Sequence, residues 1–204
     1  MRFKVLTIIS MLVCSGCAYP VQKSFIKPNV AATSQYSIVQ MTSSLIGYSP
    51  APKDEVIIEK DAIKLTLHAF ADRSNSVKIH LSIDPYEKSV NCTLNAIFIE
   101  TLNPVNRLSP SKIICWHHGP HLNDNYMEEI SGHVVVPQVK RPDHIGVTEN
   151  RYILEYSIGS LQNKNNLNFV IPEIVLTTPE EKIIFGPISF EESTEKVWYF
   201  PGTM

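Results

Sequence analysis

The chain has 204 residues, of which 44% are hydrophobic and 19% are charged. A chain of this length and composition has enough apolar side chains for the core of one globular domain. Its 18 basic and 20 acidic side chains give a formal net charge of −2, so it lacks the cationic excess with which dedicated nucleic-acid-binding proteins neutralise phosphates.

The N-terminus has the pattern of an export signal. Arg2 and Lys4 precede an apolar run over residues 5–13, and the small residues Ser15 and Gly16 follow it. A permanent membrane-spanning helix needs about 20 apolar residues, which is more than this run supplies. The sequence therefore predicts a cleaved secretory signal over residues 1–16.

The residues after the apolar run, Cys14-Ser15-Gly16-Cys17, resemble the lipobox of bacterial lipoproteins. The resemblance implies cleavage after Gly16 and acylation of Cys17, so that a covalent lipid, with no other cofactor, holds the mature chain on a membrane. Within that family, Ala18 directly after the lipidated cysteine implies the outer membrane, with the domain facing the periplasm. The resemblance covers only this segment and implies nothing about the fold of the mature chain. The alternative is an ordinary signal cleaved near Ala18, with a soluble product.

Two segments separate the signal from the first clear strand. Residues 17–35 are polar and contain Pro20 and Pro28, which predicts a lipidated N-terminus followed by a flexible tether. Residues 36–53 form an ambiguous lead-in segment, because their apolar side chains fit both a helical and a strand period.

From residue 54 to residue 204 the dominant pattern is alternation of apolar and polar side chains, which is typical of half-buried strands. Residues 63–69 and 77–83 both alternate, and the turn-forming residues between them predict a hairpin. Further strands are predicted at residues 56–59, 92–101, 111–116, 132–139, 151–159, 167–176, 182–190 and 195–200. This arrangement predicts an all-β fold, an antiparallel two-sheet sandwich of the immunoglobulin-like type, with a partly open β-barrel as the alternative.

Two local patterns refine this prediction. Pro137, Pro172 and Pro187 fall inside predicted strands, and a proline cannot donate to a sheet, so these strands are predicted to lie at edges, to be bulged or to be shorter. One short helix is predicted over residues 126–130, with a polar N-cap before it and Gly132 beyond its end.

Removal of the signal leaves Cys92 and Cys115 beside the lipidated Cys17. In an oxidising compartment, two such cysteines on predicted strands favour one disulfide, which by loop closure contributes about 3 kcal/mol. The alternative is two separate buried thiols.

Five of the seven histidines lie between residues 117 and 144, and His117, His118 and His121 flank a Gly-Pro turn. Imidazoles bind zinc, copper and nickel. Adjacent side chains in an extended chain point to opposite faces. No metal site is therefore predicted, and metal binding by these three histidines is the alternative.

Motifs of catalytic sites are missing from the sequence. None of the eight glycines builds G-x-S-x-G, G-x-G-x-x-G or a phosphate loop. The carboxylate pairs Glu180-Glu181 and Glu191-Glu192 are neighbours on predicted strands or turns, where they diverge rather than act as an acid and base pair. The chain is predicted not to be an enzyme.

These features predict a membrane-anchored cell-envelope lipoprotein, non-enzymatic, that binds or scaffolds another envelope component. Its expected partners are the membrane, through the lipid on Cys17, and an envelope protein, but no nucleic acid. Near the C-terminus, strand alternation predicts that one of Trp198 and Tyr199 faces outward, where it could anchor a partner. Two alternatives remain: a periplasmic metal-binding or sensing protein that uses residues 117–121, and a periplasmic immunity lipoprotein that blocks a toxin.

Overall fold

We describe the fold from a computed structural model of the chain. It describes residues 19–30, 36–39, 48–49, 54–72, 75–102, 105–117, 126–139, 151–159 and 167–199. The predicted signal and Cys17 lie outside these residues. Within the described ranges, no helix is both long and apolar enough to cross a bilayer.

The largest sheet, sheet B, has seven antiparallel strands and contains the predicted hairpin. The hairpin is confirmed: its two strands pair in register from Ile63 opposite Pro85 to Asp72 opposite Ser76. In spatial order the strands are β11 (Tyr126–Glu129), β10 (Lys112–His117), β13 (Arg151–Ser157), β6 (Ser76–Pro85), β5 (Ile63–Asp72), β4 (Glu55–Lys60) and β2 (Tyr36–Val39).

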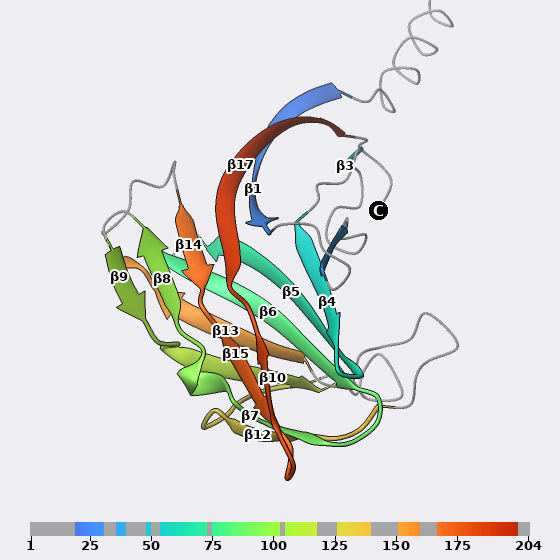
Figure 1. The fold of residues 1–204 in the computed structure, drawn as a ribbon. Helices are drawn as coiled ribbons and strands as arrows, with labels where there is room; N and C mark the ends of the chain where they lie inside the picture. Colours follow the sequence, from blue (N-terminus) through green and yellow to red (C-terminus); the bar gives the residue numbers. More distant parts are fainter. Residues whose placement is uncertain are drawn as a thin grey trace, which may run out of the picture.

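Two further antiparallel sheets, A and C, contain the other described strands (Figure 1). Sheet A runs in the order β1 (Tyr19–Asn29), β17 (Ile188–Tyr199), β14 (Asn168–Ile171), β8 (Ile99–Leu102) and β9 (Val105–Leu108), and β3 (Tyr48–Ser49) also pairs with β17. Sheet C runs in the order β12 (His133–Val136), β7 (Val90–Thr93), β15 (Ile174–Thr177) and β16 (Lys182–Phe185).

Sheets A and C are joined by three strands that continue from one sheet into the other. The chain passes from β7 to β8, from β14 to β15 and from β16 to β17, and these strands keep the same spatial order in both sheets. The passages are a 3₁₀ turn at Leu94–Ala96, the Pro172–Glu173 segment and the Gly186–Pro187 segment. Pro172 and Pro187 therefore interrupt their predicted strands, as expected for a residue without a backbone N–H, and sheets A and C are separated along this bend.

One hydrophobic core contains buried side chains from all three sheets, including Leu67 of sheet B, Phe169 of sheet A and Leu176 of sheet C. Tyr156 crosses this core, and its hydroxyl donates a 2.8 Å hydrogen bond to the Ile97 carbonyl just after the 3₁₀ turn. The all-β, antiparallel prediction is confirmed. The described strands form three sheets rather than two, and none of these sheets closes into a barrel.

The N-terminal segment differs from the predicted flexible tether. Of residues 17–35, the range Tyr19–Asn29 forms β1, which pairs along its whole length with β17. Phe25 and Ile26 of this strand are buried. The partner strand lies about 170 residues away in sequence, so local periodicity gives no sign of it. In the lead-in segment, residues 36–39 and 48–49 form strands.

The predicted short helix over residues 126–130 is also replaced by a strand. Tyr126–Glu129 forms β11, whose backbone pairs with β10 from His117 to Ile114. Pairing with a neighbouring strand satisfies the backbone polar groups of such a short segment better than a single helical turn would.

Gly186 provides a test of the bend between sheets A and C. Its φ is +116°, and a Cβ there would lie 2.7 Å from the Pro172 carbonyl oxygen. We expect Gly186→Ala to lower the free energy of unfolding by about 2–3 kcal/mol in urea titrations, because both backbone strain and a backbone clash are introduced. The matched control is Gly159→Ala, at φ +58° with nothing within 4 Å, which should cost about 1 kcal/mol. Equal costs for the two variants would contradict this account of the bend.

Candidate functional site

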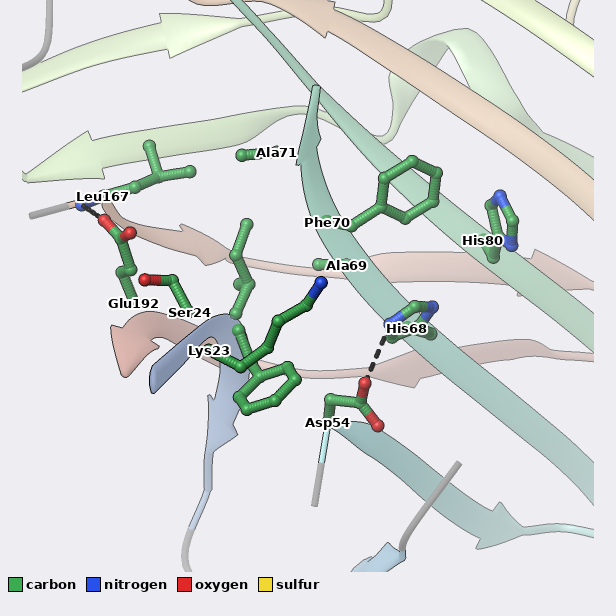
Figure 2. Close-up of a pocket in the computed structure, with 12 residues that line it drawn as sticks. Lys23, Ser24, Asp54, His68, Ala69, Phe70, Ala71, His80, Leu167 and Glu192 are labelled. Atoms are coloured by element: carbon green, nitrogen blue, oxygen red, sulfur yellow. Dashed lines mark hydrogen bonds and ion pairs between the residues drawn. The ribbon is translucent and has the colours of Figure 1, made fainter. Parts of the chain in front are cut away.

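The candidate site lies where β5 extends past its neighbour β4. β4 begins at Glu55, opposite His68, so no described strand pairs with residues 69–72 on that side. Residues 23–26 of β1 pass along this edge, and a pocket of about 530 Å³ lies between them and β5 (Figure 2). We call it the β1–β5 pocket.

A buried contact between an imidazole and a carboxylate lies in the wall of the β1–β5 pocket. His68 Nε2 lies 3.3 Å from Asp54 Oδ2, and the two side chains are only 12% and 4% exposed. A carboxylate only accepts hydrogen bonds, so Nε2 carries the proton in this contact. Within the described residues, the remaining oxygen Asp54 Oδ1 and the remaining nitrogen His68 Nδ1 are buried without a hydrogen-bond partner. Such atoms are costly to bury unless something else satisfies them.

The register of the β5–β6 hairpin places a second histidine beside His68. His80 lies opposite His68, with ring centroids 6.0 Å apart, and its ring meets the edge of Phe70 at 4.9 Å. Burial lowers the pKa of His80 to about 4, with smaller contributions from His68 and the nearby cations. His80 is therefore neutral at neutral pH.

Charged and apolar groups from other strands complete the pocket. In Figure 2 the Lys23 side chain extends from β1 toward Ala69 and His68, whereas Glu192 of β17 lies at the opposite end. A Glu192 carboxylate oxygen accepts a 3.4 Å hydrogen bond from the Leu167 backbone N–H. Buried Phe25, together with Ala69, supplies an apolar wall. The arrangement suits a ligand with an apolar body and a hydrogen-bond donor.

In comparisons with known proteins, no protein-family model matches this chain, and no curated protein or solved structure matches it.

The predicted cysteine pair is not bridged in this structure. Cys92 and Cys115 are free thiols, the first buried and the second partly buried. Cys92 lies on β7 of sheet C, and Cys115 lies on β10 of sheet B, beside Tyr152 of β13. The two cysteines belong to different sheets that face one core, which sequence spacing alone does not show. Burial raises the pKa of Cys92 to about 12.

Of the three predicted alternative metal ligands, the described residues include only His117. His117 Nε2 lies 2.8 Å from a Glu128 carboxylate oxygen, and its ring stacks on Tyr126 at 4.5 Å. His118 and His121 lie outside the described residues. Among the described side chains, no group of three or more His, Cys, Asp or Glu residues is placed to hold a metal ion.

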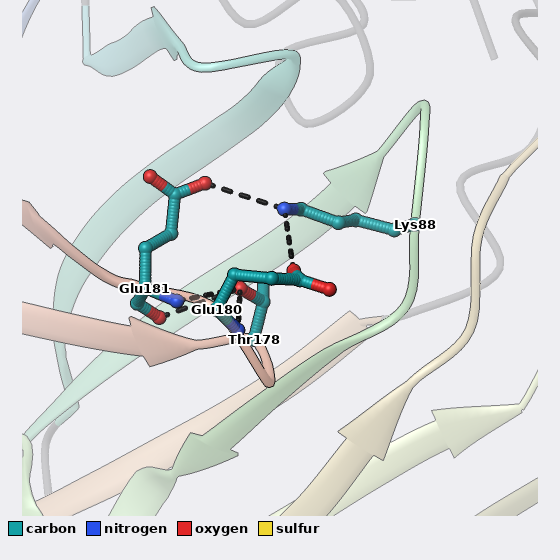
Figure 3. Close-up of polar contacts among 4 residues, drawn as sticks. All are labelled: Lys88, Thr178, Glu180 and Glu181. Carbon is teal, nitrogen blue, oxygen red and sulfur yellow. Dashed lines mark hydrogen bonds and ion pairs between the residues drawn. The ribbon is translucent and has the colours of Figure 1, made fainter.

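The carboxylate pairs form no acid and base pair in the described structure. Glu180 and Glu181 both contact the Lys88 ammonium, at 3.0 and 3.3 Å, and the Thr178 hydroxyl accepts hydrogen bonds from both of their backbone N–H groups (Figure 3). These contacts tie the β15–β16 turn to the residues after β6. Glu191 and Glu192 are neighbours on β17, and only Glu192 lines the pocket.

Asp54, His68 and His80 are not site residues in the sequence prediction. The histidines could have been found by aligning the hairpin, since its register places His68 opposite His80. Asp54 could not, because its contact with His68 depends on how β4 aligns with β5.

The depressed pKa of His80 predicts a specific loss of stability in acid. The unfolded chain takes up this proton near pH 6.5 and the folded chain only near pH 4, so the free energy of unfolding falls as the pH decreases through this window, by about 2 kcal/mol. His80→Phe keeps an aromatic ring and removes the titration, and urea unfolding at pH 7, 5.5 and 4.5 should show a smaller loss for it.

The effect of His80 on stability is measured as the difference between wild type and variant, because protonation of Asp84 changes the free energy of unfolding in the opposite direction. Burial raises its pKa to about 6, so the folded chain binds this proton first and gains stability as the pH falls toward 4. Parallel pH profiles for wild type and His80→Phe would show that His80 is solvated in the fold.

The free thiols predict an order of chemical reactivity. Cys115 is more exposed than Cys92, whose raised pKa leaves almost no thiolate at pH 8. Iodoacetamide labelling of the native protein, mapped by mass spectrometry, should modify Cys115 first and Cys92 only after unfolding. A molecule that carries the Cys92–Cys115 disulfide would label at neither position until it is reduced.

Proposed function

We propose that this protein is a lipid-anchored, non-enzymatic component of the bacterial cell envelope that binds another envelope component through the β1–β5 pocket. The observation that carries the binding role is the buried Asp54 carboxylate, which lines the pocket and has one oxygen without a partner among the described residues.

The chemistry of the pocket specifies part of the ligand. With Nε2 of His68 donating to Asp54, the two remaining atoms, Asp54 Oδ1 and His68 Nδ1, are both hydrogen-bond acceptors. Both atoms are buried, so a ligand that offers each of them an N–H or O–H donor would displace the groups that now cover them, and its apolar part would contact Phe25 and Phe70. A side chain of an envelope protein meets this description.

The geometry favours binding over catalysis. Activation of a nucleophile needs a histidine nitrogen within hydrogen-bond reach of a hydroxyl or thiol. Nε2 of His68 faces the Asp54 carboxylate, and the other ring nitrogen, Nδ1, has no hydroxyl or thiol partner among the described residues. The Ser24 hydroxyl in the pocket wall instead pairs with the Thr194 hydroxyl at 3.2 Å. His80 is held neutral by burial and packs against Phe70.

The proposed location rests on the lipobox-like segment Cys14-Ser15-Gly16-Cys17. Acyl chains on Cys17 would hold the mature chain on the outer membrane, facing the periplasm. For the fold we propose a two-layer sandwich of the immunoglobulin-like type, in which sheets A and C form one bent layer over sheet B. The protein would then be an anchored β domain with its pocket on one side. The chain passes directly between sheets A and C at three places, in the same strand order in both, and this supports the two-layer description.

The anchor is tested by replacing its acceptor. Cys17→Ser removes the thiol at the position that a lipobox acylates, so the variant should leave the membrane fraction on cell fractionation, whereas Cys115→Ser should remain there. Full retention of Cys17→Ser with the membranes would contradict lipid anchoring.

Binding in the β1–β5 pocket is tested by site-specific photocrosslinking in intact cells. A photoreactive residue in place of Ala71, exposed at the pocket, should give a defined adduct that Asp54→Asn reduces by about tenfold or more, since a hydrogen bond to a charged group is lost. Glu180→Gln, on the distant β15–β16 turn, is the matched control and should leave the adduct unchanged.

A second photoreactive position separates specific from random contact. Val105 is 80% exposed on β9, away from the pocket. Equal adducts at positions 71 and 105, or an adduct at 71 that survives Asp54→Asn, would count against the pocket as the binding site.

A further inference from the structure

The β1–β17 ribbon continues past the pocket. Beyond Lys23, residues 19–22 of β1 still pair with residues 196–199 of β17, and β3 pairs with the last residues of β17. Figure 1 shows these ends of β1 and β17 curving together away from the body of the three sheets, with β3 beside them.

The end of this ribbon is aromatic on both faces. Tyr19 and Tyr199 are cross-strand partners with ring centroids 5.4 Å apart, edge to face. Trp198 is the next residue along and so points to the opposite face. Tyr19 and Trp198 are each 49% exposed, which identifies Trp198 as the outward-facing residue of the predicted pair Trp198 and Tyr199. We call Tyr19, Trp198 and Tyr199 the aromatic tip.

The position of the aromatic tip relative to Cys17 suggests what it contacts. Tyr19 follows Cys17 by two residues, a span of at most about 7 Å for an extended chain. Since β1 begins at Tyr19, at most one residue separates this ribbon from the predicted lipidated cysteine. If Cys17 is acylated, the tip must lie at the membrane surface.

We propose that the aromatic tip inserts into the interfacial region of the membrane that holds the lipid anchor, so that the domain stands directly on the bilayer instead of hanging from a flexible tether. This inference rests on the proposed acylation of Cys17. Tryptophan and tyrosine are the side chains that prefer the headgroup level, because their rings are apolar and carry one polar group. Exposed Lys196, two residues before Trp198 on β17 and therefore on the same face of the strand, is positioned to contact lipid phosphates.

The β1–β5 pocket is connected to the aromatic tip through β1. Phe25 lies six residues beyond Tyr19 on the same strand, which corresponds to at most about 20 Å of strand. The aromatic tip and the β1–β5 pocket therefore share one strand, and the length of this strand limits how far above the bilayer the pocket opens.

The two tryptophans of the chain allow a direct test. The full chain is expressed in bacteria with its signal, purified, and reconstituted into vesicles of phosphatidylethanolamine and phosphatidylglycerol with or without brominated phosphatidylcholine. In Trp116→Phe, Trp198 is the only tryptophan. Its emission should shift to shorter wavelength on reconstitution and should lose several-fold more intensity to brominated lipid than to aqueous iodide.

The matched control is Trp198→Phe, which leaves Trp116 on β10 of sheet B. Its emission should be insensitive to brominated lipid. If Trp116→Phe does not fold, the difference between the wild-type and Trp198→Phe spectra gives the same signal.

Vesicle flotation and the mass of the Cys17 peptide separate the two proposals. A floating protein with acylated Cys17 whose Trp198 is quenched by iodide and not by brominated lipid would overturn membrane insertion of the tip and leave the anchor intact. A protein that lacks the lipid and does not float would overturn both.

Discussion

The antiparallel pairing of β1 with β17 is the constraint on which the other features of this protein depend. It joins the first and the last described residues from Tyr19 opposite Tyr199 to Asn29 opposite Ser189. Side chains add to the backbone ladder through the Lys27–Glu195 ion pair and the Ser24–Thr194 hydrogen bond. Because β1 is held along its whole length, the segment after the predicted lipidation site becomes part of sheet A, and its central residues form one wall of the pocket.

The bend between sheets A and C determines how the remaining strands meet. Pro172 and Pro187 remove backbone donors where a continuous layer would need them, and Gly186 allows the chain to pass against the Pro172 carbonyl. The core bridges this interruption, since buried residues from all three sheets form one cluster. The hydrogen bond from Tyr156 to the Ile97 carbonyl satisfies a polar group at the bend that the core would otherwise bury unpaired. Hydrophobic packing thus holds together layers that hydrogen bonding leaves separate.

The pocket follows from a mismatch in strand length. β5 extends four residues past the last pair with β4, and this end of the hairpin faces β1 across the pocket. The same step brings Asp54, just before β4, against His68. Burial lowers the pKa of His80 and keeps its ring neutral. The His68 ring instead contacts the Asp54 carboxylate. The result is a pocket with an apolar wall and, beside it, two buried atoms that lack a hydrogen-bond partner among the described residues. The aromatic tip lies on the same strand, and its proposed contact with the membrane would fix where this pocket opens.

The sequence by itself determined the elements whose information is local. Alternation in residues 63–69 and 77–83 specified the β5–β6 hairpin. Pro172 and Pro187 marked where two predicted strands break, whereas Pro20 and Pro28 lie inside β1. The tertiary structure alone decided that Tyr19–Asn29 is a strand, that residues 126–129 are extended, and that Cys92 and Cys115 lie on different sheets. The first depends on a partner strand about 170 residues away, and a pairing energy between distant segments leaves no periodic trace in either one. Residues 126–129 instead pair with the nearby strand β10, and this pairing overrides a local pattern that also suits a helical turn. The contact between Asp54 and His68 exists only once β4 is aligned on β5.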